Sequence, residues 1–130
     1  MHDNTEACRV LVVDDHKPTR ELLKAFLRGF GANIVAEAEN GEAAVRAFDE
    51  HAPDLILLDL EMPIKDGRDT LRELLEKDTE AYVVILTATS EMSVANSCIE
   101  AGARNFIRKG VPPGVLKMML KTQLDSCCAG

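Results

Sequence analysis

The feature that most constrains the fold is a regular alternation between short apolar runs and longer stretches with helical periodicity. In the stretches between the runs, apolar residues recur at helical spacing, as at Leu23, Phe26, Leu27 and Phe30. This pattern predicts strands that alternate with helices, and hence a parallel sheet covered by helices on both faces. The predicted strands are residues 9–13, 33–39, 54–58, 82–86 and 105–108, and a helix is expected after each of them.

The composition of the apolar runs predicts the order of the strands. VLVV, LILL and YVVIL are apolar throughout, which is typical of central strands buried on both faces. NIVAEAE and NFIR carry polar residues and suit the edges of the sheet. With right-handed crossovers the order becomes 2-1-3-4-5. We therefore expect an α/β fold, a doubly wound, flavodoxin-like parallel sheet of five strands built from five βα units.

Charged and hydroxyl side chains stand where the predicted strands end. The first strand leads into Asp14 and Asp15, the third into Asp59, the fourth into Thr87 and the fifth into Lys109. Because the carboxyl ends of parallel strands share one edge of the sheet, these side chains should converge. Three carboxylates so close together repel one another, and Mg²⁺ prefers such oxygen ligands. An aspartate in this setting can act as a nucleophile towards a phosphoryl group.

Four segments carry a resemblance to a known family. VVDDHK, LLDLEMPIKDG, ILTAT and FIRKG resemble, in order and spacing, the signature regions of receiver domains of bacterial two-component response regulators, which are CheY-like. The resemblance covers about residues 8–124, so we expect residues 1–130 to form a single receiver domain. It implies a phosphoprotein that acts as a signalling switch. Such a domain is not an enzyme beyond catalysing its own phosphorylation and dephosphorylation.

The resemblance also assigns roles to the acidic residues. Asp59 would accept the phosphoryl group from a phosphohistidine of a sensor histidine kinase or a histidine phosphotransfer protein. Asp15 would bind Mg²⁺ directly, and Asp14 through water, with Mn²⁺ as a possible substitute. Asp59 and the backbone carbonyl of Glu61 would complete the metal site.

A conformational switch is the next implication of the resemblance. Thr87 and Lys109 match the hydroxyl and the lysine that contact the phosphoryl group in this family. Phosphorylation would draw Thr87 inward, and Phe106 would then fill the vacated space. The affected surface consists of the fourth helix, the fifth strand and the fifth helix, to which a downstream protein would bind. Glu61 and Thr89 occupy the two variable positions that tune dephosphorylation.

Two other functional readings remain open. One is that the chain is the receiver fragment of a larger transcriptional regulator, whose DNA-binding output domain would lie outside this sequence. The other is an aspartyl-nucleophile phosphatase. In that class the nucleophile follows the first strand in a DxD arrangement, which DDHK lacks.

Charge and hydropathy limit the partners. The formal net charge of −7 argues against direct binding of nucleic acid, which requires a basic face. The sequence contains no run of 18 apolar residues, and MHDNTEACR lacks the apolar segment of a signal peptide. We therefore expect a cytoplasmic protein with no membrane contact. The modestly apolar segment EMSVANSCIEAG favours a monomer or a weak homodimer.

The four cysteines, Cys8, Cys98, Cys127 and Cys128, lack the paired CxxC spacing of zinc sites. We expect ordinary reduced thiols at all four positions. The adjacent pair at the C-terminus leaves a second reading open, in which these two residues form a redox or metal handle.

Overall fold

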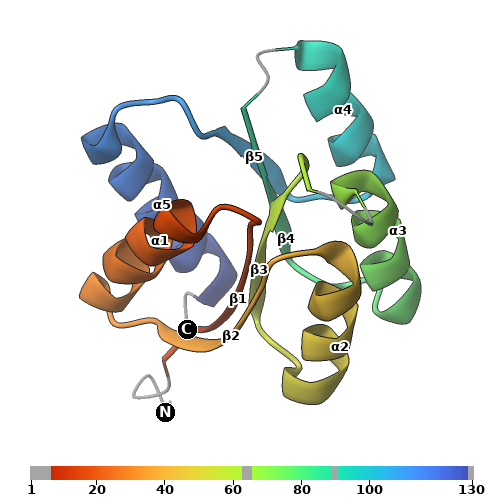
Figure 1. Ribbon diagram of the computed structural model, residues 1–130, viewed down its shortest axis with the longest axis horizontal. Helices are drawn as coiled ribbons and strands as arrows, with labels where there is room; N and C mark the ends of the chain where they lie inside the picture. The colour runs from red at the N-terminus through yellow and green to blue at the C-terminus, as the bar shows by residue number, and fades with distance from the viewer. Residues whose placement is uncertain (1–6, 63–65, 89–90, 129–130) are drawn as a thin grey trace.

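The computed structural model describes residues 7–62, 66–88 and 91–128, which form one open sheet with helices on both sides (Figure 1). The strands are β1 (Arg9–Val13), β2 (Asn33–Ala38), β3 (Leu55–Asp59), β4 (Val83–Thr87) and β5 (Asn105–Arg108). The helices are α1 (Lys17–Gly29), α2 (Gly41–His51), α3 (Gly67–Lys77), α4 (Met92–Ala101) and α5 (Pro113–Cys128).

The strand order is β2-β1-β3-β4-β5, and all four neighbouring pairs are parallel, so the predicted topology is confirmed. The three strands expected at the centre, β1, β3 and β4, are buried along almost their whole length. The two strands with polar residues, β2 and β5, lie at the edges. The predicted boundaries differ from the observed ones by one residue at β2, β3 and β4, and Asp59 becomes the last residue of β3.

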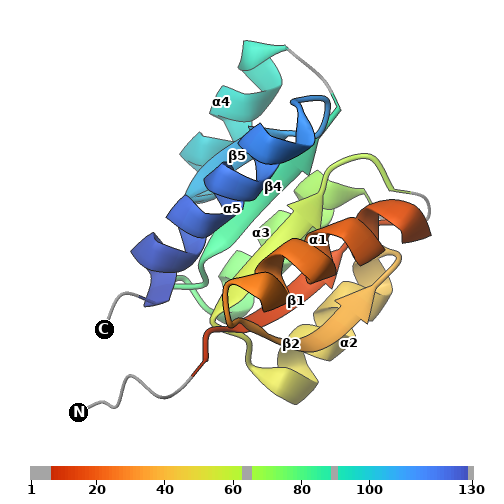
Figure 2. The ribbon, with the colours of Figure 1, turned by 90° about the vertical axis from the view of Figure 1, so that its left-hand side faces the viewer.

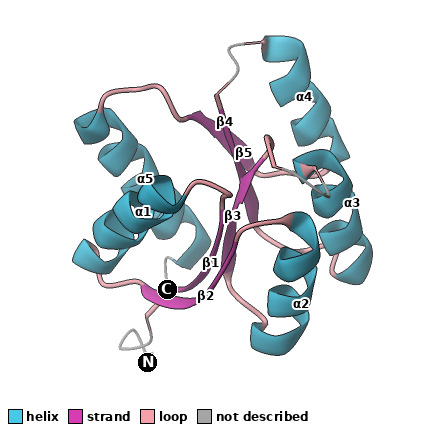
Figure 3. Cartoon of the chain, viewed as in Figure 1, coloured by secondary structure: helices cyan, strands magenta, loops and turns pink. Residues whose placement is uncertain are grey.

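The helices form two layers, with α1 and α5 on one face of the sheet and α2, α3 and α4 on the other (Figures 1 and 3). Successive side chains of a strand point to opposite faces, so each strand contributes to both cores. Leu57, for example, packs with α1 and α5, whereas Leu58 packs with the other three helices. Burial on both faces explains why the central strands are apolar from Val10, Leu55 and Val83 until they reach the carboxyl edge.

The ends of two helices are fixed by side chains that cap them. The side chain of Asn40 accepts a hydrogen bond of 2.8 Å from Ala43 N at the start of α2. Asp66 accepts one of 3.0 Å from Asp69 N at the start of α3. Each cap satisfies an N–H group that has no partner inside the helix. The second cap fixes the start of α3 at Gly67.

The fifth helix corrects the expectation for the cysteines. α5 continues as a regular helix to Cys128, which is disulfide-bonded to Cys8 just before β1. The two Cα atoms lie 5.7 Å apart, a normal separation for a disulfide. Cys98 and Cys127 are free thiols, as expected. The prediction was wrong for the other two because spacing in the sequence does not reveal that the last turn of α5 meets the start of β1.

Within the described parts of the chain, no helix is both long enough and apolar enough to cross a membrane.

Candidate functional site

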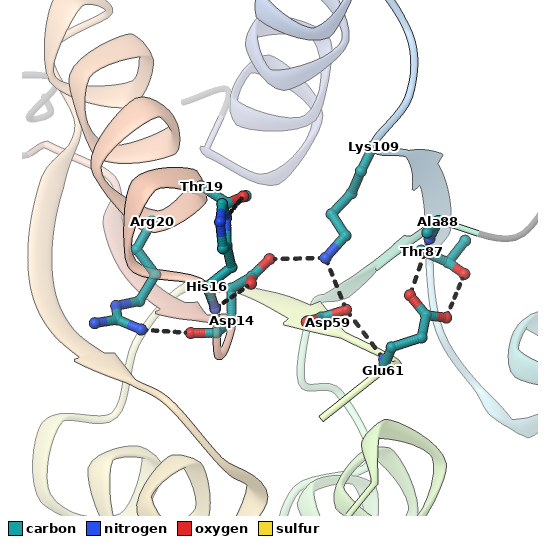
Figure 4. Close-up of polar contacts among 9 residues, drawn as sticks. All are labelled: Asp14, His16, Thr19, Arg20, Asp59, Glu61, Thr87, Ala88 and Lys109. Atoms are coloured by element: carbon teal, nitrogen blue, oxygen red, sulfur yellow. Dashed lines mark hydrogen bonds and ion pairs between the residues drawn. The ribbon is translucent and has the colours of Figure 1, made fainter. Parts of the chain in front are cut away.

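The residues predicted to converge do so at the carboxyl edge of the sheet (Figure 4). Asp14 follows β1, Asp59 ends β3, Thr87 ends β4 and Lys109 follows β5. The backbone N–H of Lys109 donates to Thr87 O at 2.8 Å, which aligns the ends of β4 and β5. Asp14, Asp59 and Thr87 are almost completely buried, although each carries a polar side chain. The sheet therefore places three polar groups at its rim where water has little access.

Lys109 joins the two buried carboxylates. Its Nζ lies 3.1 Å from Asp14 Oδ2 and 3.1 Å from Asp59 Oδ1. Burial alone lowers the pKa of Lys109, but the negative charges of Asp59 and Asp14 outweigh burial and raise it. The lysine is consequently charged at neutral pH, and it neutralises part of the charge that the two aspartates bring into the site.

The buried carboxylates are also held by backbone groups. Asp14 Oδ1 accepts a hydrogen bond of 2.9 Å from His16 N, and Asp59 Oδ1 accepts one of 3.0 Å from Glu61 N. Arg20 Nη1 donates to the backbone carbonyl of Asp14 at 2.7 Å. The two N–H contacts orient the side chains of Asp14 and Asp59 from their own loops, and Arg20 holds the backbone of Asp14. The sequence carried no signal for the contact from Arg20, because it depends on how α1 lies against the loop.

Asp59 is destabilised as a carboxylate. Burial, and then the nearby charge of Asp14, raise its pKa from 3.8 to about 7, while Lys109 and the N–H of Glu61 act in the opposite direction. Within the described residues, its Oδ2 is buried and has no hydrogen-bond partner. A buried carboxylate oxygen without a donor is costly unless a cation or another group contacts it.

The same residues fit a divalent cation. Carboxylate oxygens of Asp14, Asp15 and Asp59 lie within 4.8 Å of one another. Asp14 and Asp59 are buried, whereas Asp15 is exposed, so the cluster opens to solvent on one side. Mg²⁺ takes oxygen ligands and keeps several of its waters, which suits a cluster that is open on one side. Asp59 Oδ2 has no hydrogen-bond partner among the described residues, and such a cation would supply one.

Glu61 links the loop after β3 to the end of β4 through two hydrogen bonds. Its Oε2 accepts a hydrogen bond of 2.8 Å from Thr87 Oγ1, and its Oε1 accepts one of 2.9 Å from Ala88 N (Figure 4). The carboxylate of Glu61 thus accepts hydrogen bonds from one hydroxyl group and one backbone N–H at the end of β4. The sequence pointed to a tuning role for Glu61 but did not reveal this contact.

Gly67 lets α3 approach the backbone of Asp59. A Cβ atom at position 67 would lie 2.5 Å from Asp59 O and 2.5 Å from Leu60 Cα, closer than any real side chain allows. Gly67 N donates to Leu60 O at 3.1 Å. Only glycine fits this position, because the atoms in the way belong to the backbone. The first residue of α3 therefore packs directly against the backbone at the end of β3.

The remaining predicted residues lie further from these contacts. Phe106 on β5 is half-buried and packs against the core beneath α2, α3 and α4. That position is compatible with a static core residue and with a moving one. Thr89, the second predicted tuning residue, lies outside the described residues.

Known proteins share both the sequence pattern and the fold. Residues 10–121 match the family of response regulator receiver domains, a match that covers most of the chain. The chain belongs to this family. Receiver domains are CheY-like regulatory domains of two-component signalling, in which response regulators act with kinases and downstream targets. They bind Mg²⁺ at an acidic pocket, which corresponds here to the cluster of aspartates.

The curated relatives of this receiver include short and long proteins. The chemotaxis protein CheY of Bacillus subtilis is 41% identical over 103 residues, which are 79% of this chain and 86% of that protein. CheY of Thermotoga maritima is 34% identical over 105 residues, 81% of this chain and 88% of that protein. The transcriptional regulatory protein YdfI of Bacillus subtilis is 40% identical over 102 residues, but these are only 47% of that protein.

Solved structures give the same fold. CheY in the CheX–CheY complex with BeF₃ and Mg²⁺ from Borrelia burgdorferi has a TM-score of 0.84 and 30% identity, covering 91% of this chain and 87% of that one. The response regulator domain of Thermotoga maritima CheB has a TM-score of 0.85 and 26% identity, covering 96% of this chain and 98% of that one. The receiver fold is thus present along nearly the whole chain.

Proposed function

We propose that this receiver is a phosphorylation-controlled switch in which Asp59 accepts a phosphoryl group from a phosphohistidine of a sensor histidine kinase or a histidine phosphotransfer protein. The observation that carries the proposal is the state of Asp59 in its buried cluster. Lys109 and Glu61 N hold Oδ1, whereas Oδ2 has no partner among the described residues. One oxygen of the carboxylate is therefore fixed, and the other is available to a cation or a phosphoryl group.

Asp14, Asp15, Asp59 and the backbone carbonyl of Glu61 would hold the metal, Mg²⁺ or alternatively Mn²⁺. When bound, the cation supplies positive charge that lets phosphoryl oxygens enter a cluster of carboxylates. The residues of the chain do the rest of the positioning. Lys109 already lies 3.1 Å from Asp59 Oδ1, so its ammonium group is placed to pair with an oxygen of a phosphoryl group on Asp59.

The transfer itself is an exchange of two bonds at phosphorus. A carboxylate oxygen of Asp59 attacks, a bond from oxygen to phosphorus forms, and the bond from the donor imidazole nitrogen breaks. The departing imidazole keeps the electron pair of that bond and takes up a proton. The product is a mixed anhydride between the side chain of Asp59 and phosphate, which the charge of Lys109 stabilises.

Glu61 provides the off state of the switch. Its carboxylate occupies the hydroxyl of Thr87 and the N–H of Ala88, the donors that a phosphoryl group on Asp59 would need. Phosphorylation therefore has to displace Glu61, and like charge favours that displacement. Thr87 would then turn towards the phosphoryl group, and Phe106 would fill the space it leaves. Glu61, together with Thr89, would also tune how fast the phosphoryl group is lost.

The contacts of the site supply part of the energy that such a switch requires. Moving a two-state equilibrium from 1:99 to 99:1 takes about 5.5 kcal/mol. Hydrogen bonds to charged groups contribute about 1.5–3 kcal/mol each. New bonds from Thr87, Ala88 and Lys109 to a phosphoryl group would contribute about 4.5–9 kcal/mol, and the two bonds lost from Glu61 would offset about 3–6 kcal/mol of it, so these contacts would supply part of the required energy. The altered surface would be α4, β5 and α5, where a downstream protein would bind.

A test needs only a small acyl phosphate as donor. The intact mass of the protein is measured after incubation with acetyl phosphate, with Mg²⁺ or with EDTA, for the wild type and for Asp59→Asn. We expect the wild type to gain one phosphoryl group only with Mg²⁺, and the variant to gain none. A gain that persists in Asp59→Asn, or in EDTA, contradicts the proposal. Asp49→Asn, which removes an exposed carboxylate on α2, is the control and should behave as the wild type does.

A second candidate output follows from one of the relatives. YdfI is a transcriptional regulator, and this chain matches 47% of its length. If the receiver is one part of such a regulator, phosphorylation would control a DNA-binding domain outside this sequence rather than a separate protein. The chemistry proposed for Asp59 would be the same, and the length of the open reading frame distinguishes the two outputs.

A further inference from the structure

Three of the four cysteines gather at the edge of the sheet opposite the acidic cluster. Cys8 precedes β1, and Cys127 and Cys128 are the last residues of α5. Their sulfur atoms all lie within 4.8 Å of one another, although Cys127 and Cys128 follow Cys8 by 119 and 120 positions in the sequence. Figures 1 and 2 show the end of α5 beside the start of β1. The fold, and not local sequence, brings these sulfurs together.

The two adjacent cysteines of α5 have different surroundings. Cys128 is bonded to Cys8, with their Cα atoms 5.7 Å apart. The half-buried Cys127 instead donates its S–H to Asp54 O at 3.2 Å. Burial, and then the charge of Asp54, raise the pKa of the Cys127 thiol to about 11, so it stays protonated at neutral pH. A protonated thiol is a poor nucleophile in disulfide exchange.

We propose that Cys8 and Cys128 form a reversible disulfide clasp that fastens the last turn of α5 to the start of β1, and that Cys127 is kept out of the pair by its contact with Asp54. The clasp is a site of thiol oxidation separate from the phosphoacceptor cluster. Cys8 stands at the amino end of β1 and Asp14 beyond its carboxyl end. At about 3.3 Å per residue, the two are about 20 Å apart along the strand.

A small-molecule disulfide is the oxidant that the clasp needs. The thiolate of one cysteine attacks this disulfide, forms a mixed disulfide and releases one small thiolate. The second protein thiolate then attacks the protein sulfur of the mixed disulfide and releases the other small thiolate. Cys8 and Cys128 together lose two protons and two electrons, and the small disulfide is reduced to two thiols. A dithiol reductant reverses both steps.

Formation of the disulfide should stabilise the fold and reduce fraying at the end of α5. The bond links residues 120 apart in sequence, so it restricts the unfolded chain strongly. For a domain of this size we expect the midpoint of thermal unfolding to rise by about 5–15 °C on oxidation. Hydrogen exchange at residues 122–128 should slow at the same time, because fraying of the last turn then requires the bond to break.

The pairing is tested by peptide mapping of the full chain after incubation with oxidised glutathione and blocking of free thiols. Trypsin releases residues 1–9 with Cys8 and residues 122–130 with Cys127 and Cys128. We expect these two peptides to be cross-linked in the oxidised protein and separate after dithiothreitol. Only intermolecular dimers, or only mixed disulfides with glutathione, would overturn the proposal.

Single variants identify which sulfur takes part. Cys127→Ser should keep the cross-link and the rise in the unfolding midpoint, whereas Cys128→Ser should lose both. Cys98→Ser, at a buried cysteine beneath α4, is the matched control and should leave the cross-link intact. A cross-link in Cys128→Ser would show that Cys127 can pair with Cys8, and so that its contact with Asp54 does not keep it out of the disulfide. An unchanged midpoint in the oxidised wild type would contradict the stabilising role.

These measurements are independent of the chemistry proposed for Asp59. The oxidised and reduced proteins should both gain a phosphoryl group from acetyl phosphate. Failure of the clasp therefore leaves the phosphoacceptor proposal intact, and failure of phosphorylation leaves the clasp intact.

Discussion

The buried charge of Asp59 should make the metal-free protein less stable as the pH rises. The carboxyl has a pKa of about 7 in the folded protein, against an ordinary value of 3.8. Between these two values the folded state binds a proton that the unfolded state has lost. The free energy of unfolding therefore falls as the pH increases from about 4 to about 7, and levels off above that range.

The magnitude follows from the two pKa values. At about 1.36 kcal/mol per pKa unit, the difference between 3.8 and about 7 corresponds to about 4 kcal/mol. Asp59→Asn removes the ionisable group and keeps the shape of the side chain. Relative to the wild type, the variant should be more stable at pH 8 by up to about 4 kcal/mol. At pH 4, close to the ordinary pKa of 3.8, the folded-state carboxyl is protonated and the unfolded-state carboxyl is only partly ionised, so the two proteins should differ far less than at pH 8.

The assay is urea unfolding at pH 4 and pH 8 in EDTA, with a reductant present so that the cysteines do not contribute. A stability difference between Asp59→Asn and the wild type that does not change between the two pH values would show that the buried charge of Asp59 does not destabilise the fold. Asp49→Asn changes an exposed carboxylate on α2 and should show no such change with pH. Saturating Mg²⁺ should stabilise the wild type by about 3 kcal/mol at one hundred times its dissociation constant, and so narrow the gap at pH 8.

Three further substitutions test the parts that position the site. Glu61→Ala should speed phosphorylation by acetyl phosphate roughly fivefold, since it frees two donors and removes about 1 kcal/mol of repulsion; an unchanged or slower rate would contradict the role given to Glu61. Gly67→Ala should cost about 3 kcal/mol in urea unfolding through its clash with the backbone of Asp59, whereas Gly29→Ala, with open space around it, should cost nothing measurable. Asn40→Ala should cost about 1 kcal/mol because it removes the cap of α2, and a loss below a few tenths would show that the cap is dispensable.

Much of this fold could be predicted because the composition of each strand indicates whether one or both of its faces are buried. VLVV, LILL and YVVIL are apolar at every position, and such runs suit only strands buried on both faces. Topology then brings Asp14, Asp59, Thr87 and Lys109 to one edge without any knowledge of side-chain contacts. The observed end of β3 lies one residue beyond the predicted one because Asp59, although polar, still pairs with Leu86 of β4.

What could not be predicted depends on contacts between elements that are distant in sequence. The two hydrogen bonds of Glu61 require the loop after β3 to fold back on the end of β4. The bond between Cys8 and Cys128 requires α5 to remain helical to its last turn and to end beside β1. Neither arrangement follows from residue type or spacing, because both depend on the register and length of the elements that carry them.

Phosphate should be bonded to Asp59 itself, and locating the modified residue tests this directly. The protein is incubated with acetyl phosphate and Mg²⁺, the acyl phosphate is reduced with borohydride, and the peptides are sequenced by tandem mass spectrometry. Reduction converts an aspartyl phosphate to homoserine, so we expect homoserine at position 59 and aspartate at positions 14 and 15. Homoserine at another aspartate, with position 59 unchanged, would show that Asp59 is not the phosphoacceptor.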